Sequence, residues 1–495
     1  MTLTTPLRAA LSVVLLAGFY VLALGLIGVL GGLTFVAVTE GRVGPALQLG
    51  VLTLVSVTGV VLALVRVTRA ARAAGRGEAG ILLTRQDAPE LWRHLHEVAR
   101  IVRTRMPDEV RLVPEVNAAV SEDTRFLGLV GGRRRLYLGV PLLQGLTVGQ
   151  VRSVLAHELG HYSSAHTRLA PVAYRGREAV LATVAELHDN VVGKVLERYA
   201  YLYLLVSAAV SRSQELEADR LSVAAAGRDV AQGALRELPV LDAAWDTYLG
   251  QYVSIGLRHG YAPTSAGFFA GFGAMLAART EELGRLRTQA PLARQSRWDS
   301  HPPIAARVEA MEAMPDAGFA VHDTRPATRL VAGFDRVAAT VVDAAFEFRG
   351  VPQRLEWAPL VALSVGKHTE EVAAGFLETV ARLAQRPSAD VPLLLDLLTA
   401  GWFAELARAV APGEPAEEAA DHTRYLIRTA FQVEAVRSGA GTWQGSWAGP
   451  AMVVAPNGAV LDIAQVAELA STTQGVPAAR KWLEAAGVLA PTIAG

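Results

Sequence analysis

The chain has 495 residues, more than one compact domain usually contains. Hydrophobic residues make up 51% of it and the mean hydropathy is +0.28, which indicates that part of the apolar surface faces lipid. The 47 basic and 47 acidic residues cancel, so we expect no nucleic-acid partner. The chain has no cysteine, so any metal must be bound by histidine and carboxylate side chains.

Two long uncharged segments lie near the start of the chain. No charged residue occurs in residues 9–39 or in residues 43–65. A helix of about 20 apolar residues crosses the hydrocarbon core, so the sequence predicts membrane spans at residues 9–37 and 44–65. A signal peptide has a shorter apolar core, of roughly 7–15 residues. The alternative is a pair of buried helices in a soluble protein, which two adjacent uncharged segments of this length disfavour.

The arginines around these segments predict their orientation. Arg8 precedes the first span and Arg42 lies in the short link between the spans. Four arginines follow the second span: Arg66, Arg69, Arg72 and Arg76. Basic residues are enriched on the cytoplasmic side of membrane proteins. We therefore expect a multi-pass protein of the cell membrane, with everything after residue 70 in the cytoplasm.

The segment after Thr147 is typical of a helix that carries a metal site. Thr147 and Gln150 form a capping-box pattern, and apolar residues then recur at helical spacing. His157 and His161 are four residues apart, so both imidazoles project from one face and can bind one ion. Glu158 adjoins them and can take a proton from a water that zinc acidifies. The alternative is two surface histidines that share a helix.

A third ligand must come from another part of the chain. The metzincin pattern requires a histidine six residues after His161, but Thr167 occupies that position. An acidic ligand on a later helix is the other known arrangement. Residues 211–226 are typical of such a helix, because Gly227 follows them as a natural C-cap residue.

Glu215 and Asp219 share one face of this second helix. We expect Glu215 to bind the metal, and Asp219 to accept a hydrogen bond from the far ring nitrogen of one histidine, which would set its tautomer. The alternative is a solvated acidic face with Arg212 and Arg220 as its partners. The HELGH motif upstream favours the metal site.

In combination, these motifs resemble a family of membrane enzymes. The apolar helices, HELGH and the segment SRSQELEAD at residues 211–219 are similar to the HtpX-type and CAAX-prenyl-protease-type zinc metallopeptidases. Those gluzincins have an SRxxExxAD-like segment whose first glutamate is the third zinc ligand. SHPPIAARV at residues 300–308 resembles the HPP segment of the family, and the resemblance covers about residues 80–315. It implies a zinc metalloendopeptidase with one zinc ion per chain and polypeptide substrates.

One feature differs from the HtpX-type pattern. Those proteins usually have two more hydrophobic helices between the HExxH motif and the glutamate ligand. Here the corresponding residues, 170–210, include several charged side chains, and no uncharged span fits. We expect an amphipathic helical hairpin beside the site instead.

Three further residues are candidates for the site. His301 precedes two prolines, so it either belongs to an ordinary helix start or stabilises an oxyanion. Asn117 and Ala118 lie in residues 116–120, which are typical of an edge strand beside strand-forming residues 110–114 and 136–140. Many proteases bind substrate as an added strand on such an edge. A small structural sheet with no substrate role is the alternative.

After about residue 320 the sequence shows no metal or nucleophile pattern. Helical patterns dominate this region. Asn457 and Gly458 predict a hairpin between residues 452–455 and 459–463. His368 and His422 are isolated from other candidate ligands in the sequence. The predicted fold is mainly α with a small β-sheet (α+β). It comprises a transmembrane hairpin at residues 1–70, a zinc metallopeptidase domain at 71–320 and a mostly helical accessory domain at 321–495.

These patterns together predict a membrane-anchored zinc metalloendopeptidase that hydrolyses peptide bonds with metal-activated water. We expect it to act on membrane proteins in quality control, with its catalytic domain on the cytoplasmic side of the lipid bilayer. The alternative is a non-catalytic membrane scaffold with a structural metal site. Glu158 disfavours it, because a closed structural site has no use for a base.

Overall fold

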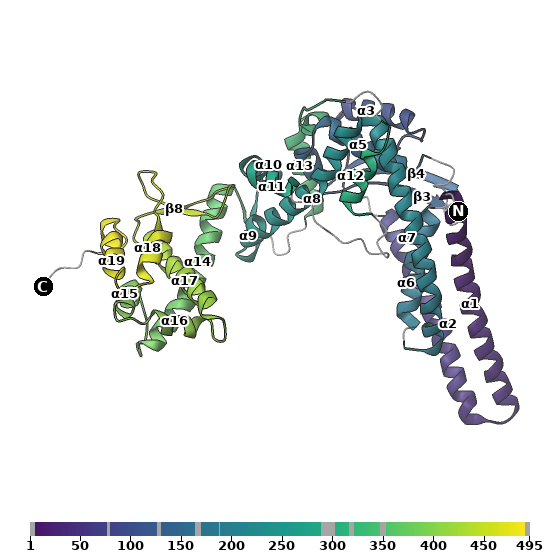
Figure 1. The fold of residues 1–495 in the computed structure, drawn as a ribbon, viewed down its shortest axis with the longest axis horizontal. Coiled ribbons are helices and arrows are strands. Elements are labelled where there is room, and N and C mark those ends of the chain that lie inside the picture. The colour runs from purple at the N-terminus through teal and green to yellow at the C-terminus, as the bar shows by residue number, and fades with distance from the viewer. Residues whose placement is uncertain are drawn as a thin grey trace. The chain divides into compact units, whose positions relative to one another are not determined.

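The computed structural model describes residues 5–76, 80–125, 130–163, 170–187, 189–288, 302–315, 321–346 and 353–490. These residues are mainly helical and form one four-stranded sheet and two two-stranded sheets, which confirms the predicted fold class (Figure 1). The chain forms two compact units. Unit 1 comprises Met1–Ala243 and Glu282–Ala345, and unit 2 comprises Ala244–Glu281 and Phe346–Gly495. The domains that the sequence predicts, with boundaries at residues 70 and 320, were defined by their expected functions, so these boundaries stay predictions.

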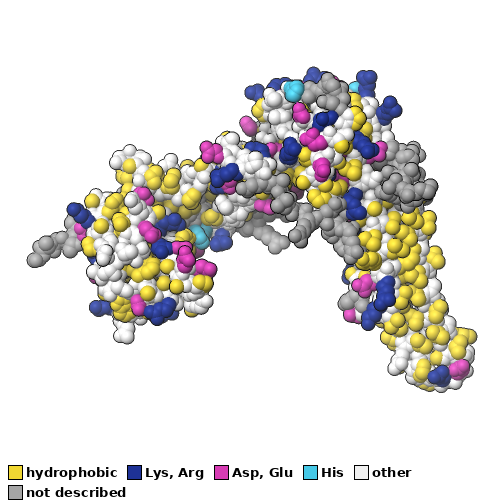
Figure 2. Space-filling view, in the orientation of Figure 1, with side chains coloured by type: hydrophobic (Ala, Val, Ile, Leu, Met, Phe, Trp, Pro, Cys, Tyr) yellow, Lys and Arg dark blue, Asp and Glu magenta, His cyan; other side chains and the backbone are white. Residues whose placement is uncertain are grey.

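Unit 1 begins with two long antiparallel helices, α1 (Thr5–Thr39) and α2 (Val43–Arg76). Within them, Ala10–Thr39 and Val43–Val67 are long and apolar enough to cross a membrane. Only 11% and 22% of their most apolar windows is buried, whereas a core helix of a soluble protein is mostly buried. Large hydrophobic side chains are exposed along both helices (Figure 2), among them Val21, Leu24, Phe35, Leu47 and Leu54.

Residues 170–210, the predicted helical hairpin, belong to α6 (Ala170–Leu187) and α7 (Val191–Ala226). Helix α6 packs against both α1 and α2, and α7 packs against α1 and α6 (Figure 1). Phe19, Val60, Leu187, Leu196 and Tyr203 lie in one buried cluster that these four helices share. Helix α7 therefore contacts the apolar hairpin near its start and carries Glu215 and Asp219 near its end.

The four-stranded sheet has the order β1-β2-β4-β3. Its strands are β1 (Ile81–Leu82), β2 (Glu109–Val113), β3 (Ala118–Arg125) and β4 (Val130–Gly139). Strands β2 and β4 are parallel, and β3 is antiparallel to β4 with Ala118 opposite Leu138. Strand β3 is thus an edge strand of this sheet. Leu112, Leu136 and Leu138 of the sheet are fully buried.

The remaining elements of unit 1 are all helical. They are α3 (Pro89–Ile101), α4 (Val140–Gly145), α5 (Val148–Gly160), α8 (Arg228–Tyr248), α11 (Thr280–Thr288), α12 (Ile304–Glu312), η4 (Ala327–Leu330) and α13 (Phe334–Ala345). Helix α8 begins in unit 1 and ends in unit 2, whereas α11 begins in unit 2 and ends in unit 1.

The predicted capping box at the start of α5 forms. The Thr147 side chain accepts a hydrogen bond from the backbone N–H of Gln150, and the Gln150 side chain accepts one from the backbone N–H of Thr147.

Unit 2 is held together by buried apolar side chains, including Phe376, Leu394 and Phe431. Its elements are η3 (Leu249–Val253), α9 (Ser254–Arg258), β5 (Tyr261–Pro263), α10 (Ser265–Ala278), β6 (Gln353–Leu355), α14 (Trp357–Leu383), α15 (Val391–Thr399), α16 (Phe403–Val410), α17 (Ala416–Arg437), β7 (Thr442–Gln444), β8 (Met452–Val454), α18 (Ile463–Ala470) and α19 (Val476–Ala485).

The hairpin predicted around Asn457 and Gly458 forms, with backbone hydrogen bonds from Ala455 N–H to the carbonyl of Ala459 and from Leu461 N–H to the carbonyl of Val453. Gly458 has a φ of +84° and forms the turn, and Val454 makes an isolated bridge to Val460. The strand partner of β8, however, is β7, with Trp443 opposite Val453. The turn is therefore determined by its own residues, whereas the strand that pairs with β8 lies upstream in the chain.

Candidate metal centre

Helices α5 and α7 lie against each other, and small side chains permit their close approach. Gly160 has no side chain, and a Cβ there would lie 3.4 Å from the Cα of Ala218. One turn further along α7, the hydroxyl of Ser222 donates to the carbonyl of Ser153 at 3.0 Å, and the two hydroxyls are 2.6 Å apart. These buried contacts set the register between the two helices.

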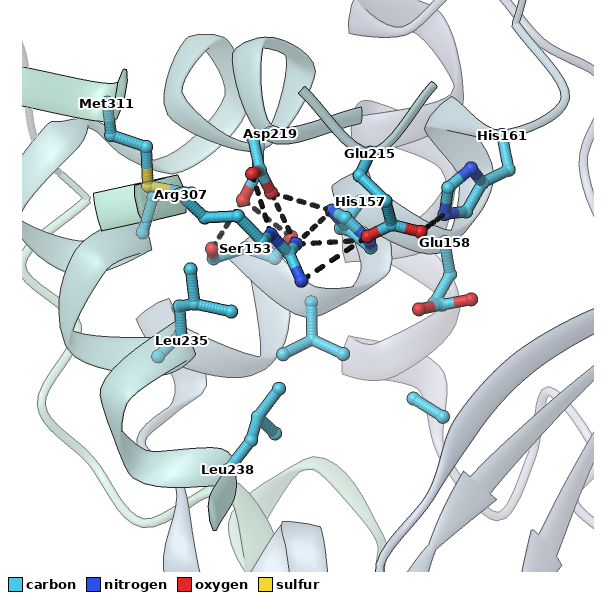
Figure 3. Close-up of a pocket in the computed structure, with 15 residues that line it drawn as sticks. Ser153, His157, Glu158, His161, Glu215, Asp219, Leu235, Leu238, Arg307 and Met311 are labelled. Atoms are coloured by element: carbon cyan, nitrogen blue, oxygen red, sulfur yellow. Dashed lines mark hydrogen bonds and ion pairs between the residues drawn. The ribbon is translucent and has the colours of Figure 1, made fainter. Parts of the chain in front are cut away.

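This packing brings His157, His161 and Glu215 together (Figure 3). The Nε2 atom of His157 lies 3.5 Å from Oε2 of Glu215, and Nε2 of His161 lies 3.7 Å from Oε1. The two imidazole rings are nearly perpendicular, with centroids 4.8 Å apart. Ligand atoms of a tetrahedral zinc site are about 3.4 Å apart. The group could therefore hold one metal ion with only small adjustments.

The charges around this group also suit a divalent cation. Among the ionisable residues that line the cavity, Glu158, Glu215 and Asp219 carry negative charge and Arg307 carries positive charge. When both histidines are neutral, as they must be to bind a metal, three carboxylates and one guanidinium leave two negative charges. A buried excess of charge is costly unless it is paired, and one divalent ion would balance it.

The sequence model of peptidase family M48 matches residues 85–315. These residues are an M48 peptidase domain. The match confirms the predicted resemblance, which covered about residues 80–315, and supports a metallopeptidase; the family is zinc-dependent in general. None of the curated proteins and none of the solved structures matches the chain.

Asp219 of the M48 domain is fully buried beside His157. Its Oδ1 atom lies 3.1 Å from Nδ1 of His157, the far ring nitrogen, as expected for the residue that would set the tautomer. Burial opposes ionisation of the carboxyl group, but hydrogen bonds from Arg307 and His157 outweigh this effect and lower the pKa of Asp219. Asp219 is therefore a carboxylate in the folded chain.

Arg307 is a residue of the site to which the sequence assigned no role. It lies on α12, is buried, and donates two hydrogen bonds to Asp219, at 2.8 and 2.6 Å. Its NH1 atom also lies 3.3 Å from Oε2 of Glu215. In the sequence, Arg307 is a single arginine in the helical segment after Pro302 and Pro303. Only the fold shows that α12 packs on α7 and so brings this arginine to the site.

The buried carboxylates change the protonation of His157. Burial opposes a charged imidazole, but hydrogen bonds to Asp219 and Glu215 outweigh it and raise the pKa of His157 to about 9. In the metal-free domain His157 is therefore protonated at neutral pH. A metal ligand must be a neutral imidazole, so a cation would have to displace this proton.

Glu158 faces open space beside the candidate ligands. Figure 3 shows its carboxylate, that of Glu215 and the ring of His161 around a common space. This space belongs to a cavity of about 320 Å³, whose wall away from the histidines is apolar and includes Leu235, Leu238 and Met311. Glu158 therefore borders both the candidate ligands and a cavity with an apolar wall.

Asn117 and Ala118, the predicted substrate-strand residues, lie at this same place. Both line an adjoining cavity of about 360 Å³ that Glu158 also borders, and Ala118 lines the first cavity as well. Tyr162, which follows the HELGH motif, donates from its hydroxyl to the carbonyl of Val120 at 2.6 Å and so ties β3 to the end of α5. His301, the candidate for oxyanion stabilisation, lies outside the described residues.

Proposed function

We propose that the M48 domain is a zinc metalloendopeptidase in which His157, His161 and Glu215 bind the metal and Glu158 is the catalytic base. The observation that carries the proposal is the convergence of both rings and the Glu215 carboxylate from two helices. Two imidazoles and one carboxylate suit zinc and leave a coordination position open, as in catalytic zinc sites. The open cavity beside Glu158 disfavours a closed structural site and hence the scaffold alternative.

The chemistry follows from the positions of the side chains. When bound, zinc would polarise the scissile carbonyl and lower the pKa of a water to about 7. Glu158 would accept a proton from the attacking water and pass it to the leaving amine as the peptide bond breaks. Asp219 would accept a hydrogen bond from the Nδ1–H of His157. This keeps the proton on Nδ1, so that Nε2 presents its lone pair to the metal site.

Arg307 would act as a positioning residue in this scheme. Its guanidinium contacts Asp219 and Glu215 at the same time, from the side of α12. It neutralises one of the buried carboxylates and holds both against rotation. The metal-binding carboxylate and the residue that orients His157 would then keep one arrangement through the reaction.

The substrate would be a polypeptide that lies along β3. Ala118 begins this edge strand, and an extended peptide can pair with a free strand edge through main-chain hydrogen bonds. The apolar wall formed by Leu235, Leu238 and Met311 would receive a hydrophobic side chain next to the scissile bond. We therefore propose endopeptidase cleavage beside apolar residues.

Helices α1 and α2 would anchor the enzyme in the cell membrane as a multi-pass hairpin. Their length, their apolar composition and their low burial support this assignment. The arginines that flank the spans favour a cytoplasmic catalytic domain. A protease held at the bilayer meets membrane proteins first, so we propose that its substrates are membrane proteins and that it serves their quality control.

Cleavage of casein or a model membrane protein by Glu158→Gln tests the proposal. We expect the variant to retain zinc and to lose activity by about 10²–10⁴-fold, the usual contribution of a general base. Glu215→Gln should lose both zinc and activity, whereas Glu217→Gln, an exposed change on the same helix, should lose neither. Equal cleavage by the wild type and Glu158→Gln would remove Glu158 from the mechanism.

A further inference from the structure

Unit 2 contains a second group of metal-ligating side chains. His259 follows α9, and His368 and Glu371 lie on α14. One donor atom of each residue lies within 4.8 Å of the other two, and Nδ1 of His259 is 3.7 Å from Oε1 of Glu371. The imidazole centroids of the two histidines are 6.4 Å apart. His368, which is isolated in the sequence, thus has two possible co-ligands in the fold.

The side chain of His259 is almost fully buried, and it makes no hydrogen bond with the described residues. Only 6% of its side chain is exposed, and its Nε2 atom is buried and has no partner among the described residues. Its nearest carboxylate, Glu371, is beyond hydrogen-bonding distance of Nδ1. A metal ion shared with Glu371 would bind at Nδ1 and would give this buried ring a polar partner that the described residues do not supply.

The spacing on α14 favours one shared ion over an accidental group. His368 and Glu371 are three residues apart, so their side chains project from the same face of the helix. Glu371 is exposed for 66% of its side chain, which leaves one side of the group open to solvent. Two imidazoles and one carboxylate, with water as a fourth ligand, form a donor set that suits zinc better than magnesium or calcium.

We propose that His259, His368 and Glu371 bind a zinc-class divalent cation at a second, structural site. Unit 2 is built from two chain segments, Ala244–Glu281 and Phe346–Gly495. His259 belongs to the first segment and the other two ligands belong to the second. The parallel pairing of β5 with β6, which begins two residues after His259, joins the same segments. The chain has no cysteine, so a metal ion supplies the cross-link that a disulfide cannot.

The test measures zinc bound per chain in the full-length protein in detergent. The protein is stripped with a chelator, equilibrated with zinc and separated from free metal. A His157→Ala, His161→Ala background removes the candidate catalytic site, so only the second site is counted. We expect about one zinc per chain in this background, and at least a tenfold weaker zinc affinity after His368→Ala or Glu371→Gln is added. His422→Ala changes an exposed histidine of the same unit and should leave binding unchanged.

Thermal unfolding supplies a second readout. Zinc should raise the unfolding midpoint of the background protein, and this rise should disappear with His368→Ala, because a ligand that binds only the folded state stabilises it. In the otherwise wild-type chain, His368→Ala should keep the ability to cleave casein, which separates this site from the proposed catalytic one. No zinc in the background protein, or equal zinc affinity with and without His368→Ala, would overturn the inference.

Discussion

Arg307 donates two hydrogen bonds, of 2.6 and 2.8 Å, to the carboxylate of Asp219, which lies fully buried in the M48 domain. Asp219 in turn lies 3.1 Å from Nδ1 of His157. A chain of contacts therefore runs from α12 through α7 to the first histidine of the HELGH motif. The orientation of a candidate ligand thus depends on a residue 150 positions away in the sequence.

Removal of the Arg307 guanidinium should weaken both the fold and the metal site. Arg307→Ala leaves a buried carboxylate without its partner, and loss of one member of a buried ion pair costs about 3–5 kcal/mol. We also expect about 10–100-fold weaker zinc affinity, as for other residues that orient a ligand. Chemical unfolding and competition with a chelator measure the two effects. Arg220→Ala, an exposed change on α7, serves as the control; equal zinc affinity in both variants would contradict the positioning role.

The raised pKa of His157 predicts how the stability of the metal-free protein changes with pH. A group whose pKa is higher in the folded chain stabilises the fold while it is protonated. Its contribution is full below the unfolded value of about 6.5 and is lost as the pH rises through about 9. In chelator-treated protein, the advantage of wild type over His157→Gln in unfolding free energy should therefore shrink between these pH values. A constant difference would show that His157 does not titrate in this range.

The packing of α7 on the apolar hairpin should affect the metal site at the other end of the helix. Leu196 is fully buried in the cluster shared with α1 and α2, and Leu196→Ala should cost about 2–5 kcal/mol. Because the same helix carries Glu215, we expect zinc affinity to fall as well. Leu202→Ala makes the same change at a side chain that is half exposed on α7. If both variants lose zinc affinity equally, the hairpin contacts do not support the site.

The apolar wall of the cavity should set the substrate preference. Leu238→Phe narrows the space between this wall and Glu158. We expect kcat/KM for peptides with leucine beside the scissile bond to fall about 10–100-fold, while peptides with alanine there are cleaved nearly as before. A series of quenched fluorescent peptides that differ only at that position measures the ratio. An unchanged ratio would place the specificity pocket elsewhere.

Several features of this protein follow from short stretches of sequence. The two uncharged segments form long apolar helices, and Thr147 with Gln150 caps α5 as predicted, because both depend on residues close together in the chain. Helical periodicity also puts His157 and His161 on one face, and Glu215 and Asp219 on one face, whatever the rest of the fold does. The candidate ligands could be named for this reason.

Only the tertiary structure decided which of these faces meet. Contact between α5 and α7 depends on packing at Gly160 and Ala218, and the place of Arg307 depends on α12, far along the chain. The same holds for His259, which meets His368 only because α9 packs on α14. Sequence periodicity acts over a few turns of helix, whereas contacts between distant segments are selected by the burial of apolar surface over a whole unit. A single sequence therefore reveals the members of a site more readily than the neighbours that hold them in place.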